Sequence, residues 1–392
     1  MIIRNFFKLL PEKGMWRIIP QVRKDRIDGK LRSERGRAVN IEDLPERAPL
    51  WKNREGVAAG LKDAVVLVTG AAGTVGSGIV RRLMAFECKR VILLDQAEMP
   101  LSELHKELLA FSPRPGVKAV LGSVTDSCRM RHVFEECRPQ YVFHAAANKH
   151  VSLMEAAPYE AILTNVGGAS LLADLAVEFG VKKFMMVSTS DAVNPSNVVG
   201  ISHRISEIYV QALARLPQMK TQFITTRFGN VLGSNGSVVP LFIKQIEAGG
   251  PVTVTSPDIA RRFISVAETC RLILESVFMG RGGEIYLFDM GEPVKIYDLA
   301  VKMISLAGLK PEVDIPIRFT GLRPGERLHE ESAAYTETSI TTSHPRIRIA
   351  KTKEYNYDAV KHAVDELLKA TQAEPAESLV QRMKTLVSEF TR

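Results

Sequence analysis

The stretch Thr69-Gly70-Ala71-Ala72-Gly73-Thr74-Val75-Gly76-Ser77-Gly78 directly follows the apolar run Val65-Val66-Leu67-Val68. A short run of aliphatic and β-branched residues is typical of a buried parallel strand. Glycines after such a strand let the backbone turn tightly and approach a diphosphate at the N-terminus of the next helix. The stretch therefore predicts a strand, a phosphate-binding turn and a helix that continues through Leu83.

A second apolar run, Val91-Ile92-Leu93-Leu94, ends in Asp95, about 20 residues after the glycines. A carboxylate at this spacing accepts hydrogen bonds from the hydroxyls of an adenosine ribose. Because it would repel a 2′-phosphate, Asp95 favours NAD over NADP. The predicted cofactor contacts so far are Gly70, Gly73, Thr74, Val75, Gly76 and Asp95. The competing interpretation is a structural turn followed by a solvated Asp.

Strands and helices alternate as far as residue 226. The predicted helices are 102–111, 127–137 with Ser127 as N-cap, 158–178 and 202–214, and the predicted strands are 117–121, 141–147, 182–187 and 222–226. This alternation predicts an α/β protein with a Rossmann-like, doubly wound parallel sheet that binds ligands at its carboxyl edge. Beyond Arg227 the rhythm loosens and glycines become frequent, which predicts a smaller C-terminal substrate-binding lobe.

The composition is that of a globular chain, with 45% hydrophobic and 24% charged residues among 392. No run of about 18 apolar residues occurs and the start lacks the pattern of a signal peptide, so we expect no transmembrane helix and a cytoplasmic protein. Cys88, Cys128, Cys137 and Cys270 form no CxxC pair. This spacing argues against a metal site or a disulfide framework and predicts buried thiols.

The net charge of +8 is concentrated in residues 1–40, which hold eleven Lys and Arg against four Asp and Glu. The remainder is near neutral, so the charge does not predict binding of nucleic acid by the folded part. A basic arm is most often a solvated extension. The alternative is weak contact of segment 1–10 with a membrane surface, as a short amphipathic helix that Pro11 ends.

Five further stretches carry specific motifs. They are Asn40-Ile41-Glu42-Asp43-Leu44, His144-Ala145-Ala146-Ala147-Asn148-Lys149-His150-Val151, Ala192-Val193-Asn194-Pro195-Ser196-Asn197, Arg227-Phe228-Gly229-Asn230-Val231-Leu232-Gly233-Ser234 and Thr320-Gly321-Leu322-Arg323-Pro324-Gly325-Glu326. With the glycine turn, they resemble the polysaccharide-biosynthesis branch of extended short-chain dehydrogenase/reductases, and within it the soluble UDP-N-acetylglucosamine 4,6-dehydratases. The resemblance covers residues 40 to 351.

In that family NAD(P)+ oxidises C4 of the sugar, water leaves across C5 and C6, and hydride returns to C6. The resemblance implies a nucleotide-sugar dehydratase (a lyase) or epimerase acting on a UDP-N-acetylhexosamine in polysaccharide or glycan biosynthesis. It adds Asp126, Ala145 and Ala146 to the cofactor residues. The substrate residues it implies are His150, Asn165, Arg227, Asn230, Arg261, Arg323 and Glu326, with the Arg323 guanidinium pairing with the diphosphate.

The catalytic stretch departs from the family pattern. Relatives read Ser-Thr-Asp-Lys, where the Asp acts as acid and the Lys as base, but this chain reads Ser188-Thr189-Ser190-Asp191. The family Tyr or Met is Val199 here, the family Lys is His203, and a family Tyr is Asn148. The lost lysine matters most, because its ammonium binds the nicotinamide ribose and lowers a neighbour's pKa, whereas a neutral imidazole does only the first.

Two interpretations remain open. In the first, the chain is an altered but active enzyme with Thr189, Asp191, His203 and Lys149 as catalytic residues. Asp191 then takes the C5 proton, and His203 or Lys149 supplies protons. In the second, the chain binds NAD and a nucleotide sugar, has lost the reaction, and partners an active paralogue.

We expect four segments along the chain. They are a basic arm and linker at 1–60, an NAD-binding Rossmann domain at 61–228, a sugar-nucleotide-binding lobe interleaved with it at 229–351, and C-terminal helices at 352–392. Two helices separated near Pro375 have apolar spacing on one side. Such helices suit packing within the chain or a homo-oligomer.

Overall fold

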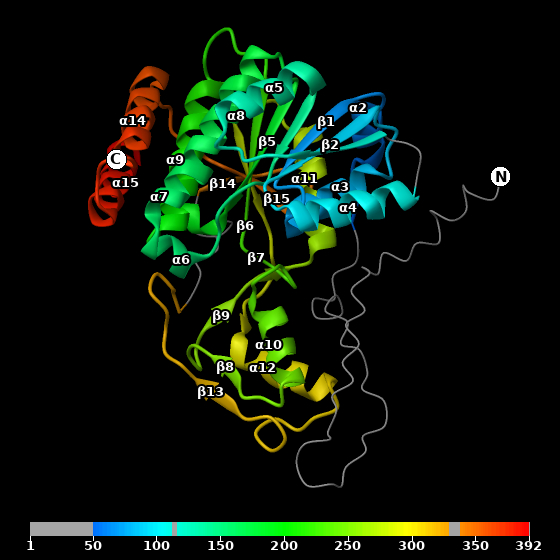
Figure 1. The fold of residues 1–392 in the computed structure, drawn as a ribbon, viewed down its shortest axis with the longest axis vertical. Coiled ribbons are helices and arrows are strands. Elements are labelled where there is room, and N and C mark those ends of the chain that lie inside the picture. The colour runs from blue at the N-terminus through cyan, green and yellow to red at the C-terminus, as the bar shows by residue number, and fades with distance from the viewer. Residues whose placement is uncertain (1–49, 112–115, 329–337, 392) are drawn as a thin grey trace, which may run out of the picture. The chain divides into compact units, whose positions relative to one another are not determined.

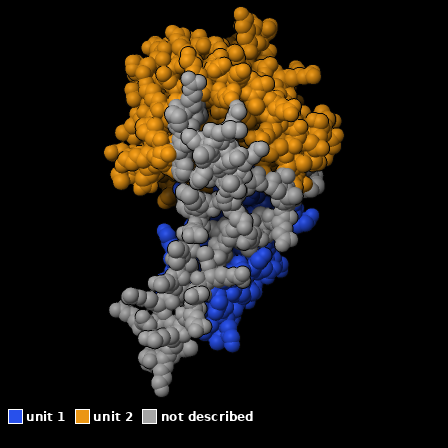
Figure 2. All heavy atoms as spheres, turned by 90° about the vertical axis from the view of Figure 1, so that its right-hand side faces the viewer, with its two compact units in different colours: residues 1–49, 230–267, 290–330 blue, residues 50–229, 268–289, 331–392 orange. Residues whose placement is uncertain are grey.

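The computed structural model describes residues 50–111, 116–328 and 338–391. They form two compact units (Figure 2): a smaller unit of 230–267 and 290–328, and a larger unit of 50–229, 268–289 and 338–391. The basic arm, its segment 1–10 and the motif at 40–44 lie outside the described residues. Each unit has its own hydrophobic core and is considered separately.

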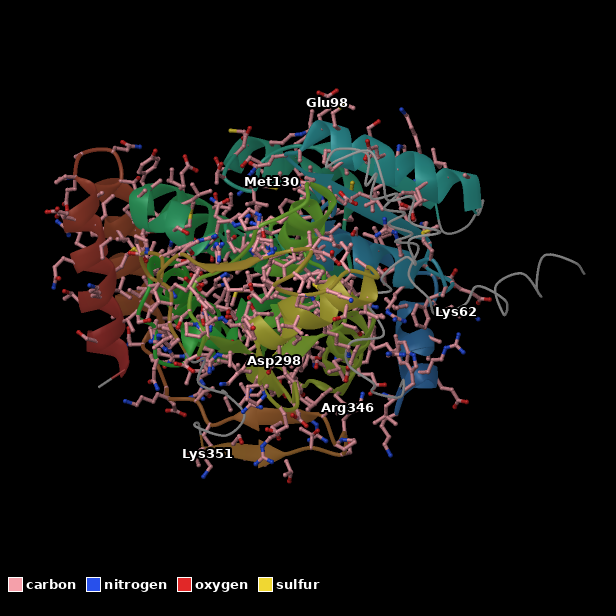
Figure 3. The ribbon with its side chains drawn as sticks, turned by 90° about the horizontal axis from the view of Figure 1, so that it is seen from below. Lys62, Glu98, Met130, Asp298, Arg346 and Lys351 are labelled. Carbon is pink, nitrogen blue, oxygen red and sulfur yellow. The ribbon has the colours of Figure 1, made fainter. Side chains whose placement is uncertain are left out.

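The larger unit is built on a nine-stranded sheet (Figure 1). Its strands are β1 (Val65–Thr69), β2 (Arg90–Asp95), β3 (Gly116–Leu121), β4 (Tyr141–His144), β5 (Lys183–Thr189), β6 (Gln222–Phe228), β11 (Glu284–Phe288), β14 (Ser339–Thr341) and β15 (Ile347–Ala350). The strand order is β14-β15-β11-β6-β5-β4-β1-β2-β3. The seven strands from β11 to β3 run parallel, whereas β15 and β14 pair antiparallel at one edge. Figure 3 labels Arg346 and Lys351, which flank β15.

The strand order reverses at β1, because β2 and β3 extend to one side and β4, β5 and β6 to the other. Right-handed crossovers then place the connecting helices on opposite faces of the sheet. These helices are α3 (Thr74–Leu83), α4 (Glu98–Phe111), α5 (Ser127–Cys137), α8 (Gly168–Glu178), α9 (Val198–Ala214) and α11 (Val266–Met279). The predicted Rossmann-like fold is confirmed, and its reversal point is where ligands bind in open α/β sheets.

Several predicted helix boundaries were wrong. Helix α9 begins four residues before the predicted start, because the Asn197 side chain accepts from the Gly200 amide and caps it there. The N-cap of α5 is Asp126, whose carboxylate accepts from the Arg129 amide, so the predicted cap Ser127 is the first helical residue. The polar linker contains a helix that the prediction missed, α2 (Arg54–Leu61), capped by Asn53.

The chain after β4 is helical from residue 158 to 178, as predicted. It comprises α7 (Pro158–Ala161), a π-helical segment (Ile162–Gly167) and α8, and the short α6 (Val151–Ala156) precedes it. Among the described residues, Pro158–Glu178 is the one helix whose length and apolar composition would suffice to cross a membrane, which the count of apolar runs did not anticipate. Since 61% of its most apolar window is buried, it has the character of a core helix.

The C-terminal helices α14 (Tyr357–Ala370) and α15 (Ala376–Thr391) pack on α9 and share one core with it (Figure 1). Most of the positions with the predicted apolar spacing are buried, including Val360, Val364 and Met383, whereas Leu368 is half-buried. Three cysteines are buried as predicted, but Cys128 lies on the exposed face of α5, so the prediction was wrong for that thiol.

The smaller unit contains two helices and several short strands. They are β7 (Asn230–Val231), α10 (Val238–Glu247), β8 (Val252–Val254), β9 (Ala260–Arg261), β10 (Phe263–Ile264), β12 (Val294–Lys295), α12 (Ile296–Leu306) and β13 (Ile317–Phe319). The strands pair as β7 with β10, β9 with β12 and β8 with β13. Helices α10 and α12 bury Phe242 and Met303 in a core that also takes Val252 from β8. This core is independent of the core beneath α9.

Candidate functional site

The glycine turn connects β1 to α3 and passes very close to the backbone that follows β4. Gly70 has φ +64°, and a Cβ there would lie 2.6 Å from the amide nitrogen of Ala146 and 2.7 Å from the carbonyl of Ala145. A Cβ on Gly76 would lie 2.0 Å from the carbonyl oxygen of Gly70. Both glycines are therefore required by the close approach of backbone to backbone.

Helix α3 begins at this turn with an N-terminus that no side chain caps. Its N-cap is Gly73, and its first turn contains Thr74, Val75 and Gly76. The first amides of a helix have no acceptor within the helix, and the helix dipole adds partial positive charge there. An anionic diphosphate fits the donors that this turn presents.

Asp95 ends β2 beside the glycine turn. Its Oδ2 accepts from the Ala72 amide at 2.9 Å, and its Oδ1 accepts from the Ala97 amide at 2.9 Å. The carboxylate is thus fixed in orientation, while each oxygen keeps a lone pair for another donor. Asp126, also predicted to bind the cofactor, has its Oδ1 engaged as the cap of α5. Ala145 and Ala146 lie half-buried directly after β4.

Thr189 and Asp191 lie where β5 ends in a short 3₁₀ turn (Ser190–Ala192). The hydroxyl of Thr189 accepts from the Asp191 amide at 3.2 Å and keeps its own proton available for donation. The first turn of α9 lies against this turn, because a Cβ on Gly200 would come within 2.6 Å of the Asp191 carbonyl oxygen. Helix α9 therefore approaches Asp191 so closely that only a glycine fits at position 200.

His203 faces this region from α9 and is 8% exposed. Burial lowers its pKa, and the negative charges of Glu207 and Asp191 oppose that effect only in part. The structure thus brings His203 into the electrostatic neighbourhood of Asp191. The imidazole is neutral at pH 7, so it does not replace the permanent positive charge of a lysine.

A second buried histidine was missed by the sequence analysis. His144 ends β4, and its Nδ1 lies 2.8 Å from the hydroxyl of Thr69 at the end of β1. Burial, with a smaller contribution from His203, lowers the pKa of His144 to about 3. Its place at the end of an apolar strand was the available signal, since parallel strand ends meet at one edge.

The loop after β4 carries Lys149 and His150, which both reach the surface, although partial burial lowers the pKa of the Lys149 ammonium. Asn165, in the π-helical segment, holds this loop from both sides. Its Oδ1 accepts from the Asn148 amide at 2.7 Å, and its Nδ2 donates to the Asn148 carbonyl at 3.0 Å. Because Nδ2 also donates to Ser202 of α9 at 2.9 Å, Asn165 links the loop to that helix. Asn165, predicted to contact substrate, therefore has its side chain engaged in holding this loop.

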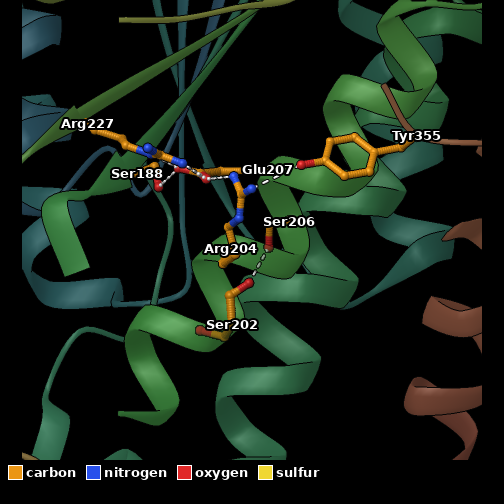
Figure 4. Close-up of polar contacts among 7 residues, drawn as sticks. All are labelled: Ser188, Ser202, Arg204, Ser206, Glu207, Arg227 and Tyr355. Carbon is orange, nitrogen blue, oxygen red and sulfur yellow. Dashed lines mark hydrogen bonds and ion pairs between the residues drawn. The ribbon is translucent and has the colours of Figure 1, made fainter. Parts of the chain in front are cut away.

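Arg227, another predicted substrate residue, is 1% exposed in the centre of the sheet. Its guanidinium pairs with Glu207, which is fully buried on α9 (Figure 4). The resemblance implied that Arg227 contacts the substrate, whereas the structure buries its guanidinium against the carboxylate of Glu207. Glu207 was missed, although its place four residues after His203 puts both on one helix face.

The remaining predicted substrate residues lie in the smaller unit. Arg261 donates to three backbone carbonyls, those of Ala260 at 2.8 Å, Leu328 at 3.1 Å and Arg327 at 2.6 Å. Glu326 accepts from the amide of Arg323 at 3.1 Å. These contacts hold the turn at 321–328 in shape and leave the Arg323 side chain exposed.

Asn230 opens the smaller unit and donates from Nδ2 to the Arg262 carbonyl at 3.4 Å. This bond supports the parallel pairing of β7 with β10. Among the described residues, no group of three or more His, Cys, Asp or Glu side chains has the arrangement of a metal site.

Comparison with known proteins supports a family assignment. The family model described as "Polysaccharide biosynthesis protein" matches residues 66–352. The chain belongs to this family. Its matched region contains the glycine turn, the Asp191 turn, α9 and the smaller unit, so the polysaccharide biosynthesis family spans both units.

Two curated relatives and one solved structure illustrate the similarity. The chain is 42% identical over 346 residues to the capsular polysaccharide biosynthesis protein CapD of Staphylococcus aureus, covering 88% of this chain and 57% of CapD. It is 32% identical over 279 residues to the inverting UDP-N-acetylglucosamine 4,6-dehydratase of Campylobacter jejuni, covering 70% and 79% of the two chains. The X-ray structure of Pen from Bacillus thuringiensis matches with a TM-score of 0.68 at 29% identity, covering 76% and 90%.

The chain thus spans somewhat over half the length of CapD. The family match confirms the resemblance to the polysaccharide-biosynthesis branch of extended short-chain dehydrogenase/reductases. These similarities do not identify the reaction, so the roles of Asp191, His203 and Asn148 are argued from the site itself.

Proposed function

We propose that this chain is a nicotinamide-dependent nucleotide-sugar dehydratase or epimerase that acts on a UDP-N-acetylhexosamine in polysaccharide or glycan biosynthesis. One observation carries the proposal. The glycine turn follows β1, and the Asp191 turn follows β5 in the same parallel sheet, with β4 between them. The similarity to an inverting UDP-N-acetylglucosamine 4,6-dehydratase supports the dehydratase class.

The residues at the glycine turn fit a dinucleotide. The uncapped first turn of α3 offers amides of Thr74, Val75 and Gly76 to a diphosphate, and Asp95 offers acceptors to a ribose. A nicotinamide dinucleotide bound there supplies a hydride acceptor for the sugar carbon C4 and the hydride that C6 later receives. The chain's own residues must then bind and orient the sugar and move its protons.

NAD is proposed in preference to NADP because of Asp95. Two backbone amides already orient its carboxylate, so the group cannot swing away from a ligand without losing both bonds. A 2′-phosphate beside this fixed negative charge would be repelled, whereas a ribose hydroxyl can donate to it.

Binding of the sugar hydroxyl and transfer of the sugar's protons are proposed for Thr189, Asp191 and Lys149. The Thr189 hydroxyl donates to the sugar hydroxyl that becomes the C4 ketone and so orients it. The amine of Lys149, whose pKa is lowered by burial, takes the C4 hydroxyl proton as the hydride leaves C4 and gives it to the C6 hydroxyl, which leaves as water. The Asp191 carboxylate takes the C5 proton and returns it to C5 when C6 receives the hydride. His203, a buried neutral imidazole, orients rather than donates, since burial lowers its pKa. The exposed Arg323 side chain is proposed to pair with the diphosphate.

The proposal is tested by purifying the full chain and identifying any bound nucleotide by mass spectrometry. The protein is then incubated with UDP-N-acetylglucosamine, and the expected product is lighter by one water. Asp191→Asn should abolish that product while the protein keeps its bound nucleotide. Absence of turnover with a panel of sugar nucleotides, despite bound NAD, would contradict an enzymatic function.

A second candidate function is a nucleotide-sugar-binding protein that has lost the reaction and partners an active paralogue. The observation in its favour is the neutral, buried His203 at the position of the family lysine. The triple variant Ser190→Asp, Asp191→Lys, His203→Lys restores the family residues. Turnover in this variant alone supports the lapsed protein, whereas turnover in the natural chain excludes it.

A further inference from the structure

Glu207 is the centre of a buried polar network between α9 and the sheet (Figure 4). Its Oε1 accepts from the Ser188 hydroxyl and from Arg227 Nε, both at 2.7 Å. Its Oε2 accepts from Arg227 Nη2 at 2.5 Å and from Arg204 Nη1 at 3.2 Å. The two-point pairing with Arg227 fixes the carboxylate plane as well as its position.

The network reaches the outer side of α9 through Arg204. While Nη1 of Arg204 donates to Glu207, its Nη2 donates to the hydroxyl of Tyr355 at 3.0 Å. Tyr355 lies just before α14 and contributes to the core that α9, α14 and α15 share. The helix is therefore held by directional bonds from β5 and β6 on one side and from the C-terminal segment on the other.

Stability alone does not account for this pair. Glu207 is fully buried and Arg227 is 1% exposed, so both charges are removed from water. Burial alone would raise the pKa of Glu207, but the charge and hydrogen bonds of Arg227 lower it overall, so the carboxylate stays ionised. Apolar residues of similar volume often stabilise a core as well as a buried ion pair does. What the ion pair adds is a single defined orientation of α9.

That orientation matters at the candidate site. Glu207 lies one helical turn after His203, and Ser188 immediately precedes Thr189. The contact between Gly200 and the Asp191 carbonyl leaves no room for a Cβ, so a small shift of α9 changes how His203 lies relative to Asp191. The groups that the network joins are thus the neighbours of the proposed catalytic residues.

We propose that Glu207 and Arg227 are a positioning pair that holds α9 in the register where His203 faces the Asp191 turn. The expected effect on kcat rests on the proposed function, but the expected effect on the position of His203 does not. Neither residue touches substrate; they act through His203 and Asp191. Arg227, first assigned to the substrate, acquires this role instead.

Arg227→Lys tests the pair because it keeps the charge and loses the two-point bond. The matched control is Arg346→Lys. Arg346 pairs with buried Glu268 at 2.6 Å in the same unit, beside β15 (Figure 3). Three quantities are measured for both variants: the urea midpoint, kcat and KM with UDP-N-acetylglucosamine, and the histidine Cε1–H resonance of His203 by NMR.

We expect Arg227→Lys to lower kcat by about tenfold or more with KM within about twofold of the natural value, since small misplacements of catalytic groups are costly. The His203 resonance should move, although the local charge is unchanged. Arg346→Lys should lower the urea midpoint and leave kcat and the His203 resonance unchanged. Natural kcat and an unmoved His203 resonance in Arg227→Lys would overturn the positioning role.

If the natural chain has no turnover, the proposed function fails, and the positioning role is judged by the His203 resonance alone. If Arg227→Lys does not fold, Ser188→Ala takes its place, because it removes one bond to Glu207 and leaves both charges. We expect Ser188→Ala to move the His203 resonance in the same direction by a smaller amount. An unmoved resonance in this variant overturns the inference equally.

Discussion

Gly70→Ala is the most direct test of the close approach at the glycine turn. The new Cβ would lie 2.6 Å from the Ala146 nitrogen and 2.7 Å from two atoms of Ala145, all of them backbone. Backbone atoms cannot rotate away as a side chain can. A non-glycine residue in the left-handed region costs about 1–2 kcal/mol, and forcing an atom into a filled space costs about 1–3 kcal/mol more. We therefore expect a loss of about 2–5 kcal/mol in the free energy of unfolding.

Gly180→Ala separates these two contributions. Gly180 has φ +65°, almost the value at Gly70, yet no heavy atom lies within 4 Å of a Cβ there. Both variants therefore carry the same backbone strain, and only Gly70→Ala adds a contact between the new Cβ and other backbone atoms. The difference between their urea midpoints measures the effect of that contact. Gly70→Ala should also weaken NAD binding, measured by fluorescence titration, by about tenfold or more, whereas Gly180→Ala should not. Equal urea midpoints for the two variants would refute the close approach.

Three further predictions follow from particular contacts. Asp95→Asn should reduce the preference for NAD over NADP by about tenfold, because a neutral amide does not repel a 2′-phosphate; an unchanged ratio in binding titrations would contradict this. Burial lowers the pKa of His144 to about 3 in the folded protein. Below pH 6.5 the His144 imidazole is therefore protonated in the unfolded chain and stays neutral in the folded chain. The free energy of unfolding should therefore fall by about 2 kcal/mol between pH 6.5 and pH 5 because of this group. Urea titrations of His144→Asn should lack that part of the pH dependence. Asn197→Ala removes the cap of α9 beside the Asp191 turn, so it should lower the free energy of unfolding by about 1 kcal/mol and also lower turnover. Asn356→Ala removes the equivalent cap of α14 and should lower the free energy of unfolding without changing turnover.

Local patterns were sufficient to predict the Rossmann-like sheet. The runs at Val65 and Val91 are buried strands, and the glycines between them meet backbone where a Cβ cannot fit. Such features depend on residues near one another in sequence. Parallel direction then follows from the alternation of strands and helices, whereas the strand order and the antiparallel edge of β15 and β14 were not predicted.

Helix starts were less predictable, because they depend on which polar side chain reaches a free amide. Asn197 caps α9, although the apolar periodicity appeared clear only from Ser202 onward. At α5 two adjacent residues, Asp126 and Ser127, both suit a cap, and the structure uses the first. Sequence alone does not rank such neighbours.

Partners of the buried charges could not be predicted, since they come from distant segments. Arg227 and Glu207 lie on a strand and a helix, and no local pattern says that they pair. The same holds for Asn165 and Asn148, whose contact depends on a π-helical segment. The residues first assigned to substrate therefore divide into those that hold the site in shape and those left exposed, such as His150 and Arg323.

The central claim is that the chain moves hydride within a sugar nucleotide, and one labelled substrate tests it. UDP-N-acetylglucosamine carrying deuterium at C4 is incubated with the purified full chain and NAD, and the product is analysed by NMR. We predict a 4-keto product with the deuterium at C6. An epimer with the deuterium still at C4 would contradict dehydration and assign the chain to the epimerases, and unchanged substrate would contradict the central claim itself.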